Sequence, residues 1–175
     1  MLRFYKVKMK YVRNLQNVDS INNILSVSSQ RHKNKRLFLG IVIMLDNHKY
    51  CIPLSSVEEK DKYSKMSENI TLRKIRNENG DVIAVLNINN MIPVREEYII
   101  PFDIEKLADD TEKQAAYKKH CLEELAWCNK HENEIIRLAK ELHRMICSNE
   151  NFSKRKICPN YKLLEKECDK CKIIP

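Results

Sequence analysis

The chain has 175 residues, of which 43% are hydrophobic and 32% charged, and it contains no apolar run of about 18 residues, which excludes a membrane-spanning helix. Its formal net charge of +8 is unevenly distributed: residues 1–76 carry 16 Lys and Arg against 6 Asp and Glu, residues 77–152 carry 9 against 15, and residues 153–175 carry 7 against 3. This asymmetry favours an anionic partner such as a nucleic acid, and the lack of an apolar signal-peptide stretch near Met1 predicts a cytoplasmic protein without membrane contact.

A strand and a helix are predicted before the first polar loop. Residues 2–7 alternate between apolar and polar side chains, which is the period of a strand, and residues 8–18 place apolar side chains at helical spacing. Residues 19–36 are rich in Ser, Asn and cations and predict a loop. Two strands, 37–45 and 49–54, should then form a hairpin, because Asp46-Asn47-His48 suits a tight turn.

A second hairpin and one more strand pair are predicted next. Strands within residues 70–75 and 81–88 flank the turn Asn77-Glu78-Asn79-Gly80. The apolar stretches 91–94 and 98–102 should pair with each other, with prolines near their ends.

Helical periodicity dominates the second half of the chain. A short helix is expected from Asp103 to Leu107. Residues 111–148 are helical in pattern, with a break near 129–133, and a final helix is predicted near 160–166.

The order of these elements predicts the fold class. Strands that come first and helices that follow are typical of an α+β fold, in which an antiparallel, twisted sheet packs on helices. We expect one domain, 1–175, with a sheet-rich part, 1–102, and a helix-rich part, 103–175.

Seven cysteines are present, an odd number, and no secretion signal accompanies them. Cys168 and Cys171 form a Cys-x-x-Cys pair with Cys158 upstream, but a zinc site usually needs two such pairs. We therefore expect reduced thiols, no metal ion and no other cofactor.

Several enzyme classes are excluded by missing motifs. With two glycines, Gly40 and Gly80, no Gly-rich loop can hold a nucleotide phosphate, and no H-E-x-x-H or G-x-S-x-G motif occurs. The carboxylates of the basic half are too scattered for a two-metal nuclease site. A nuclease built on this chain would therefore cleave RNA without metal, using the ribose 2′-hydroxyl as nucleophile, a base, an acid and donors for the developing phosphorane charge.

Such groups meet at the open end of the first predicted hairpin. Arg36 precedes its first strand and Ser55 with Ser56 follows its second strand, so the hairpin brings them to one edge. Lys60 and Lys62 follow shortly after, and a lysine packed among cations can exchange a proton near neutral pH. The simpler interpretation is that the serines form a turn or helix cap and that Arg36 is a surface cation. Among the histidines, His32 remains an acid–base option, whereas His48 lies in the turn at the other end of the hairpin.

Four stretches occur in a familiar order and spacing: FYKVKMKYVRNL from Phe4, RLFLGIV with HKYCIPLSS in the hairpin, NINNMIPV from Asn87, and NYKLLEKE up to about Lys166. Together they resemble the ToxN/AbiQ family, the protein toxins of type III toxin–antitoxin systems. The resemblance implies a metal-independent endoribonuclease with a barrel-like sheet of the MazF/Kid-like fold, giving 2′,3′-cyclic phosphate and 5′-hydroxyl ends. It also implies growth arrest or phage defence, and inhibition by a small repeat RNA pseudoknot that the toxin cuts from its precursor and that assembles the toxin into a larger complex.

Catalytic residues carry over from the family by motif. The family's tyrosine on the first helix matches Tyr11, its basic residue before the hairpin matches Arg36, and its Thr/Ser-Ser pair matches Ser55 and Ser56. Family members usually continue with Pro-Lys or another close basic residue, whereas this chain continues with Val57-Glu58-Glu59-Lys60-Asp61-Lys62. We therefore expect Lys60 as the catalytic lysine, with Lys62 as the alternative.

Basic and aromatic residues around this edge should bind cellular RNA substrates and the antitoxin RNA. Contacts with phosphates give salt-sensitive affinity, and splayed bases can stack on aromatic rings such as Tyr63. The residues expected to bind RNA are Lys8, Lys10, Arg31, Lys33, Lys35, Phe38, Lys62, Lys154, Arg155 and Lys156.

Two other functions fit the same composition. A non-catalytic RNA-binding protein would explain the charge but would give no role to Arg36, Ser55 and Ser56. A toxin-like inhibitor of a protein target such as a topoisomerase would use an apolar patch and would not need the serines. The sequence does not determine the cleavage site, the antitoxin sequence, the stoichiometry, or which group is the acid and which the base.

Overall fold

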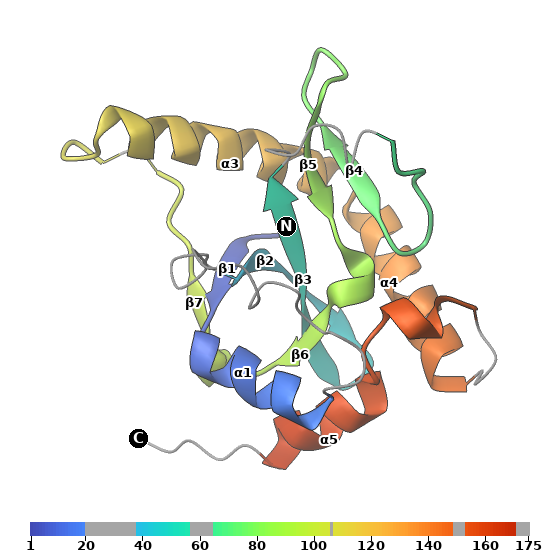
Figure 1. Cartoon of the computed structure of the whole chain (residues 1–175). Coiled ribbons are helices and arrows are strands. Elements are labelled where there is room, and N and C mark those ends of the chain that lie inside the picture. Colours follow the sequence, from blue (N-terminus) through green and yellow to red (C-terminus); the bar gives the residue numbers. More distant parts are fainter. Residues whose placement is uncertain (20–37, 57–64, 106, 149–152, 171–175) are drawn as a thin grey trace.

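The computed structural model describes residues 1–19, 38–56, 65–105, 107–148 and 153–170 (Figure 1). Within these residues, seven strands form one antiparallel sheet and four α-helices pack around it. No helix among them is long and apolar enough to cross a membrane. The strands are β1 (Phe4–Val7), β2 (Phe38–Leu45), β3 (His48–Ser56), β4 (Arg73–Arg76), β5 (Val82–Leu86), β6 (Ile92–Val94) and β7 (Ile99–Pro101); the α-helices are α1 (Met9–Val18), α3 (Glu112–Lys130), α4 (Glu132–Ser148) and α5 (Tyr161–Lys170).

The strand β3 joins two halves of the sheet. The order is β4-β5-β3-β2-β1-β7, and β6 pairs with β3 outside this path. The first half of β3 lies between β2 and β6, and its last residues pair with β5 instead. The described strands do not close into a barrel, because β4 and β7 lie at the two ends of the order. The prediction that residues 91–94 pair with 98–102 is wrong, since β6 pairs with β3 and β7 pairs with β1.

The hairpin of β2 and β3 forms as its sequence predicts. Leu45 faces His48 across a two-residue turn, in which Asp46 has a φ of 50°, a left-handed conformation that Asp tolerates better than most residues. At the other end of the hairpin, a Cβ on Gly40 would lie 2.3 Å from the Ile52 carbonyl oxygen. The close approach of the two strands therefore requires glycine at this position.

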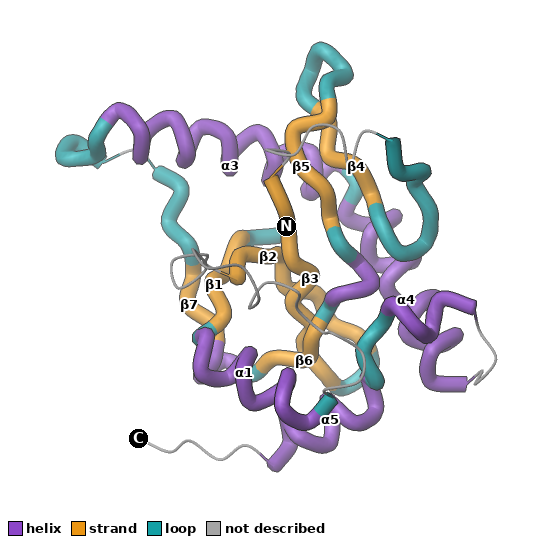
Figure 2. Tube along the Cα trace, viewed as in Figure 1, coloured by secondary structure: helices purple, strands orange, loops and turns teal. Residues whose placement is uncertain are grey.

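Two hydrophobic cores lie on opposite faces of the sheet, as the alternation of strand side chains requires. Along β3, Ile52 belongs to the core shared with α3 and α4, whereas Cys51 belongs to the core shared with α1 and α5. Figure 2 shows the strands in the middle, with α1 and α5 below them and α3 and α4 above and to the right. Because the first core joins strands of the sheet-rich part to helices of the helix-rich part, we propose that residues 1–175 form one domain.

The helical half follows its predicted pattern with two differences. Thr111 and Gln114 form a capping box at the start of α3, and the predicted break lies at His131, between α3 and α4. The predicted helix from Asp103 is wrong for the described residues 103–105 and 107, because the Asp103 side chain accepts the Glu105 N–H in a local turn instead. The six described cysteines are free thiols, and no group of three or more metal-binding side chains occurs among the described residues. Cys171, the partner of Cys168 in the predicted pair, lies outside those residues.

Candidate functional site

The open end of the β2–β3 hairpin carries the predicted catalytic serines. β2 begins at Phe38 and β3 ends at Ser56, so the antiparallel pairing places both strand ends at the same end of the hairpin. Ser55 and Ser56 are the last two residues of β3, rather than part of a loop after it. Arg36, Lys60 and Lys62 lie outside the described residues, so their approach to the serines stays a prediction.

Ser55 is held by a buried asparagine. Asn87 is 8% exposed, and its side-chain Nδ2 donates to Ser55 Oγ at 3.0 Å. The backbone of Asn87 is fixed as well, since its N–H donates to the Pro53 carbonyl at 2.9 Å and its own carbonyl accepts the Asn90 N–H at 3.0 Å. Because Ser55 Oγ accepts from Asn87, its hydroxyl proton remains available for an acceptor such as a phosphate oxygen.

The sheet also places a lysine on the face that carries Ser55. Ser55 faces Val85 on β5, and Val85 faces Lys74 on β4, so the three residues form one row. Side chains in one row project from the same face, and two strand spacings separate the Cα atoms of Ser55 and Lys74 by about 10 Å. Lys74 is buried, and its backbone N–H donates to Glu68 Oε1 at 2.9 Å. This row adds a positive charge to the serine face of the sheet.

Asn87 and Lys74 were not predicted as site residues. Asn87 opens the NINNMIPV stretch that carries part of the family resemblance, so its position in a shared motif was the available signal. Lys74 lies in the first strand of the predicted second hairpin, so its pairing with β5 was expected. No pattern in the sequence indicates that β3 would pair with the other side of β5 and so bring Ser55 into the same row.

Tyr11 occupies a different environment from Ser55. It is 2% exposed, its hydroxyl donates to the Pro93 carbonyl at 2.8 Å, and its ring stacks on Tyr98 at 4.2 Å. These contacts tie α1 to β6 and to the turn before β7. The geometry therefore gives Tyr11 a packing role, and its predicted catalytic role stays a prediction.

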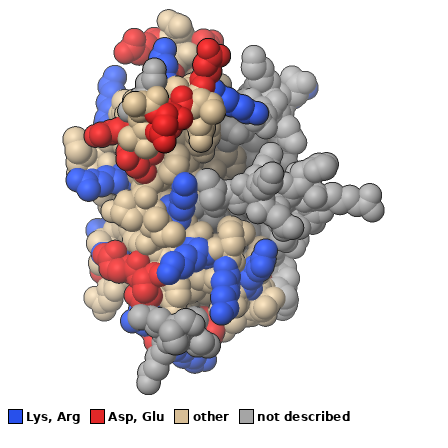
Figure 3. Space-filling model, turned by 90° about the vertical axis from the view of Figure 1, so that its left-hand side faces the viewer, with Lys and Arg blue, Asp and Glu red and all other residues tan. Residues whose placement is uncertain are grey.

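The described cations predicted to bind RNA lie in two places. Lys8 and Lys10 are exposed at the start of α1, and the first 18 residues contain no Asp or Glu. Figure 3 shows Lys and Arg side chains gathered across the lower part of the face that it draws, with Asp and Glu side chains at the left edge of that part. Lys154, Arg155 and Lys156 lie in a 3₁₀ turn, Ser153–Ile157, where Arg155 donates to the Ile146 carbonyl near the end of α4.

The remaining predicted RNA contacts and one acid–base option lie outside the described residues. For Phe38 the structure gives the backbone position at the start of β2. The others are Arg31, His32, Lys33, Lys35, Lys62 and Tyr63.

A partly buried polar cluster lies at the opposite end of the hairpin. Glu165 on α5 accepts hydrogen bonds from Tyr50 Oη at 2.7 Å and from His143 Nε2 at 2.9 Å, and His48 lies beside Glu165 and Asp169. Burial disfavours the imidazolium, but interactions with Cys147 and Glu165 raise the pKa of His143 to about 9. Burial likewise disfavours the carboxylate, but His143 and Tyr50 hold the pKa of Glu165 below its ordinary value. The cluster ties α4 and α5 to the start of β3, and His48 lies away from the serines as the sequence predicts.

Comparison with known proteins agrees with this architecture. The family described as "Toxin ToxN, type III toxin-antitoxin system" matches residues 3–169. The protein is therefore of the class of toxins from type III toxin–antitoxin systems. The chain is a member of the ToxN family, which confirms the resemblance in its sequence motifs.

Relatives and solved structures extend this assignment. Endoribonuclease AbiQ from Lactococcus lactis subsp. lactis is 32% identical over 133 residues, covering 71% of this chain and 69% of that protein. Endoribonuclease ToxN from Pectobacterium atrosepticum is 26% identical over 121 residues, covering 67% of this chain and 68% of that protein. The structure of AbiQ, described as a lactococcal anti-phage endoribonuclease of a type-III system, superposes with a TM-score of 0.76 at 19% identity, covering 97% of this chain and 96% of that one. A toxin described as selectively inhibited by a non-coding RNA pseudoknot superposes with a TM-score of 0.75 at 20% identity, with the same coverage.

Proposed function

We propose that this chain is an endoribonuclease toxin that cleaves RNA without metal, leaving 2′,3′-cyclic phosphate and 5′-hydroxyl ends. Its family and the activity named for its relatives support the reaction class. The observation that supports the site is the hydrogen bond from Asn87 to Ser55, which orients the hydroxyl of a residue that we assign by motif to the family's serine pair. A serine needed only to cap a turn would not require a buried asparagine from another strand connection to orient it.

The reaction follows from the groups at the hairpin end. A base removes the proton of the ribose 2′-hydroxyl, the 2′-oxygen attacks phosphorus, and the 5′-oxygen leaves with a proton from an acid. Ser55, Ser56 and Arg36 donate to the phosphate oxygens, where negative charge increases in the transition state. Lys60, or Lys62 in its place, carries out one of these two proton transfers. Lys74 adds positive charge from the same face as Ser55.

The partners follow from the same family assignment. We propose that a small repeat RNA, folded as a pseudoknot and cut from its precursor by the toxin, inhibits this chain and assembles it into a larger complex. Structures of family relatives are described as pseudoknot-inhibited and as regulated by a processed non-coding RNA, which supports this proposal. Free toxin would cleave cellular RNA in the cytoplasm and arrest growth, including during phage infection. We also retain the MazF/Kid-like fold as a proposal for the twisted sheet.

The test is RNA cleavage by antitoxin-free protein in excess EDTA, with the product ends mapped. We expect cyclic-phosphate ends from the wild type and losses of about 100-fold or more for Ser55→Ala, Ser56→Ala and Lys60→Ala. Ser148→Ala is the matched control, because Ser148 lies exposed on α4 and bonds its own helix at the Arg144 carbonyl. Cleavage that survives the three substitutions would place the active site elsewhere.

Two further outcomes identify the alternative functions. A folded wild type that binds RNA without cutting it is a non-catalytic RNA-binding protein. A wild type that neither binds nor cuts RNA, yet stops growth when expressed, acts on a protein target.

A further inference from the structure

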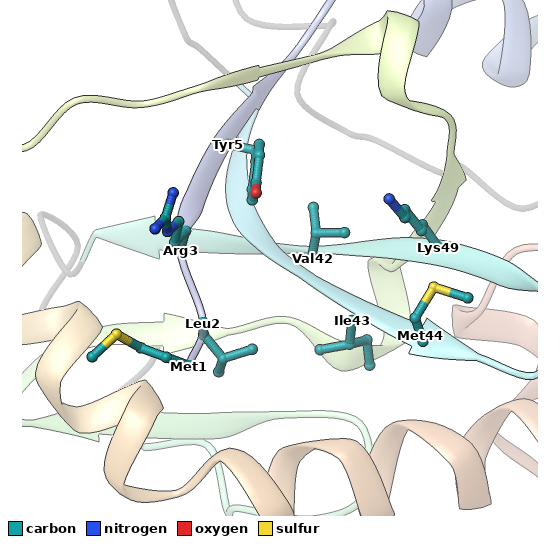
Figure 4. A pocket seen from close by; sticks show the side chains of 8 residues that line it. All are labelled: Met1, Leu2, Arg3, Tyr5, Val42, Ile43, Met44 and Lys49. Atoms are coloured by element: carbon teal, nitrogen blue, oxygen red, sulfur yellow. The ribbon is translucent and has the colours of Figure 1, made fainter.

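A hollow opens on the sheet beside the start of β1, and we call it the β1 hollow. Its volume is about 290 Å³, and Figure 4 shows Tyr5 between the cationic side chains of Arg3 and Lys49. We propose that the β1 hollow binds one unpaired nucleotide of the RNA strand that is cleaved, with the base against Tyr5 and the phosphates near Arg3 and Lys49. This proposal rests on the proposed endoribonuclease function. The lining residues are Met1, Leu2, Arg3, Tyr5, Val42, Ile43, Met44 and Lys49.

The lining combines the chemistry that single-stranded nucleic acids require. Tyr5 is half-buried and packs against the second core, so its ring is held in place by the protein and still borders the hollow. Val42 and Met44 provide an apolar wall, and Met44 is 50% exposed although it is a large apolar side chain. An unpaired base stacks on an aromatic ring in most single-strand binding sites. The volume lies close to the lower limit of ordinary ligand pockets, about 300 Å³, which suits a single nucleotide rather than a duplex.

The charges around the hollow favour a phosphate. Arg3 is exposed and lies within residues 1–18, a segment without carboxylates. Lys6 projects from the opposite face, where its ammonium lies over the Phe102 ring, so it does not add to the charge of the hollow. Among the described residues, two carboxylates pair with cations of the lining: Glu96 pairs with Lys49, and Glu132 lies 3.4 Å from the Met1 amino group. A phosphate that binds to Lys49 therefore displaces the Glu96 carboxylate, whereas a phosphate can bind to Arg3 directly.

The hollow and Ser55 lie on the same face of the sheet. Tyr5 faces Gly40 on β2, and Gly40 faces Pro53 on β3, so two strand spacings, about 10 Å, separate the Cα atoms of Tyr5 and Pro53. Ser55 follows two residues after Pro53, which adds about 7 Å along the strand and keeps the same face. Lys49, on the far side of the hollow, lies six residues before Ser55 on β3, which is about 20 Å along the strand. One extended RNA strand can therefore span Ser55 and the β1 hollow, so that a nucleotide a few positions from the cleaved bond selects or positions the substrate.

The test measures binding of a mixed-sequence, single-stranded RNA 20-mer to the full chain carrying Ser55→Ala, which prevents cleavage. In that background we expect Tyr5→Ala to weaken binding by about 5-fold to 150-fold, the range for one stacked base, and Tyr5→Phe to retain most of the affinity. Arg3→Gln should weaken binding and reduce the slope of log Kd against log salt by about 1. The matched controls are Tyr117→Ala, an exposed aromatic on α3, and Arg137→Ala, an exposed cation on α4.

A second measurement locates the base directly. The same RNA with 4-thiouridine in place of uridine, irradiated on the protein, should crosslink to the peptide that contains Tyr5. Binding by Tyr5→Ala and Arg3→Gln that equals the controls, or crosslinks that avoid β1, would overturn the β1 hollow while RNA binding by the parent protein remains. If the wild type itself neither binds nor cleaves RNA, that result would instead overturn the proposed function. Because Arg3 is exposed, Arg3→Gln stays informative even where Tyr5→Ala destabilises the fold.

Discussion

Replacing Asn87 by Ala should disable the site while leaving the fold intact. The substitution removes the side-chain hydrogen bond to Ser55 but keeps the two backbone hydrogen bonds that Asn87 makes with Pro53 and Asn90. A neutral hydrogen bond of this kind contributes about 0.5–1.5 kcal/mol, so the free energy of unfolding should fall by about 1 kcal/mol. This loss is small enough for the protein to remain folded at ordinary assay temperatures.

The loss of cleavage should be larger than the loss of stability suggests. Without Asn87, the Ser55 hydroxyl can occupy three staggered rotamers instead of one, and it no longer has a fixed direction for its proton. Removing a transition-state donor altogether costs about 100-fold or more, which is the limit set by Ser55→Ala. We therefore expect Asn87→Ala to lower kcat by about 10-fold to 100-fold, with little change in KM, because misplacing the donor affects the transition state and not substrate binding.

The decisive assay is a double-mutant cycle on kcat. If Asn87 acts through Ser55, the double variant Asn87→Ala with Ser55→Ala should be no slower than Ser55→Ala alone. Asn90→Ala is the matched control, since Asn90 lies in the same turn but bonds to the Asn89 amide instead of a serine. Additive losses in the double variant, or wild-type kcat for Asn87→Ala, would refute the positioning role of Asn87.

Three further predictions concern the frame that holds this site. The His143 pKa is raised above its unfolded value to about 9, so its stabilising contribution is complete below about pH 6.5 and is lost as the pH rises toward 9. We expect the free energy of unfolding, measured in urea, to fall by about 2–3 kcal/mol over that range and to change less with pH in His143→Gln. Tyr11→Phe leaves the buried Pro93 carbonyl without its donor and should lower the free energy of unfolding by about 1–3 kcal/mol. In the folded variant, a loss of cleavage of about 100-fold would show that Tyr11 is catalytic, and cleavage near wild type would show that it has a packing role alone. Gly40→Ala places a Cβ 2.3 Å from a backbone oxygen and should destabilise the protein by about 3 kcal/mol in chemical denaturation; a wild-type midpoint would mean that the two strands can separate there without cost.

The local pattern of the sequence determined most of the elements. The two-residue turn at Asp46 and Asn47, the helix after β1 and the break at His131 are all set by residues a few positions apart, so turn types and apolar spacing suffice to predict them. The same holds for the serine pair at the end of the hairpin, because antiparallel pairing requires the start of β2 and the end of β3 to meet. The ordered motifs also predicted the family, which the match over residues 3–169 confirms.

The tertiary structure decided which of these elements meet. The partner of Ser55 is Asn87, 32 positions away, and neither the period of a strand nor the chemistry of a turn specifies such a contact. The same is true of β6 and β7, which look like a strand pair in the sequence. Instead, β6 pairs with β3 and β7 pairs with β1, because the backbone N–H and C=O groups along one side of β3 and of β1 also need hydrogen-bond partners. Tyr11 is buried because α1 packs against β6. Its exposed neighbours Lys8 and Lys10 do not indicate that burial. Local patterns fix what each segment can become, whereas the burial of apolar surface and the pairing of every buried polar group fix where it goes.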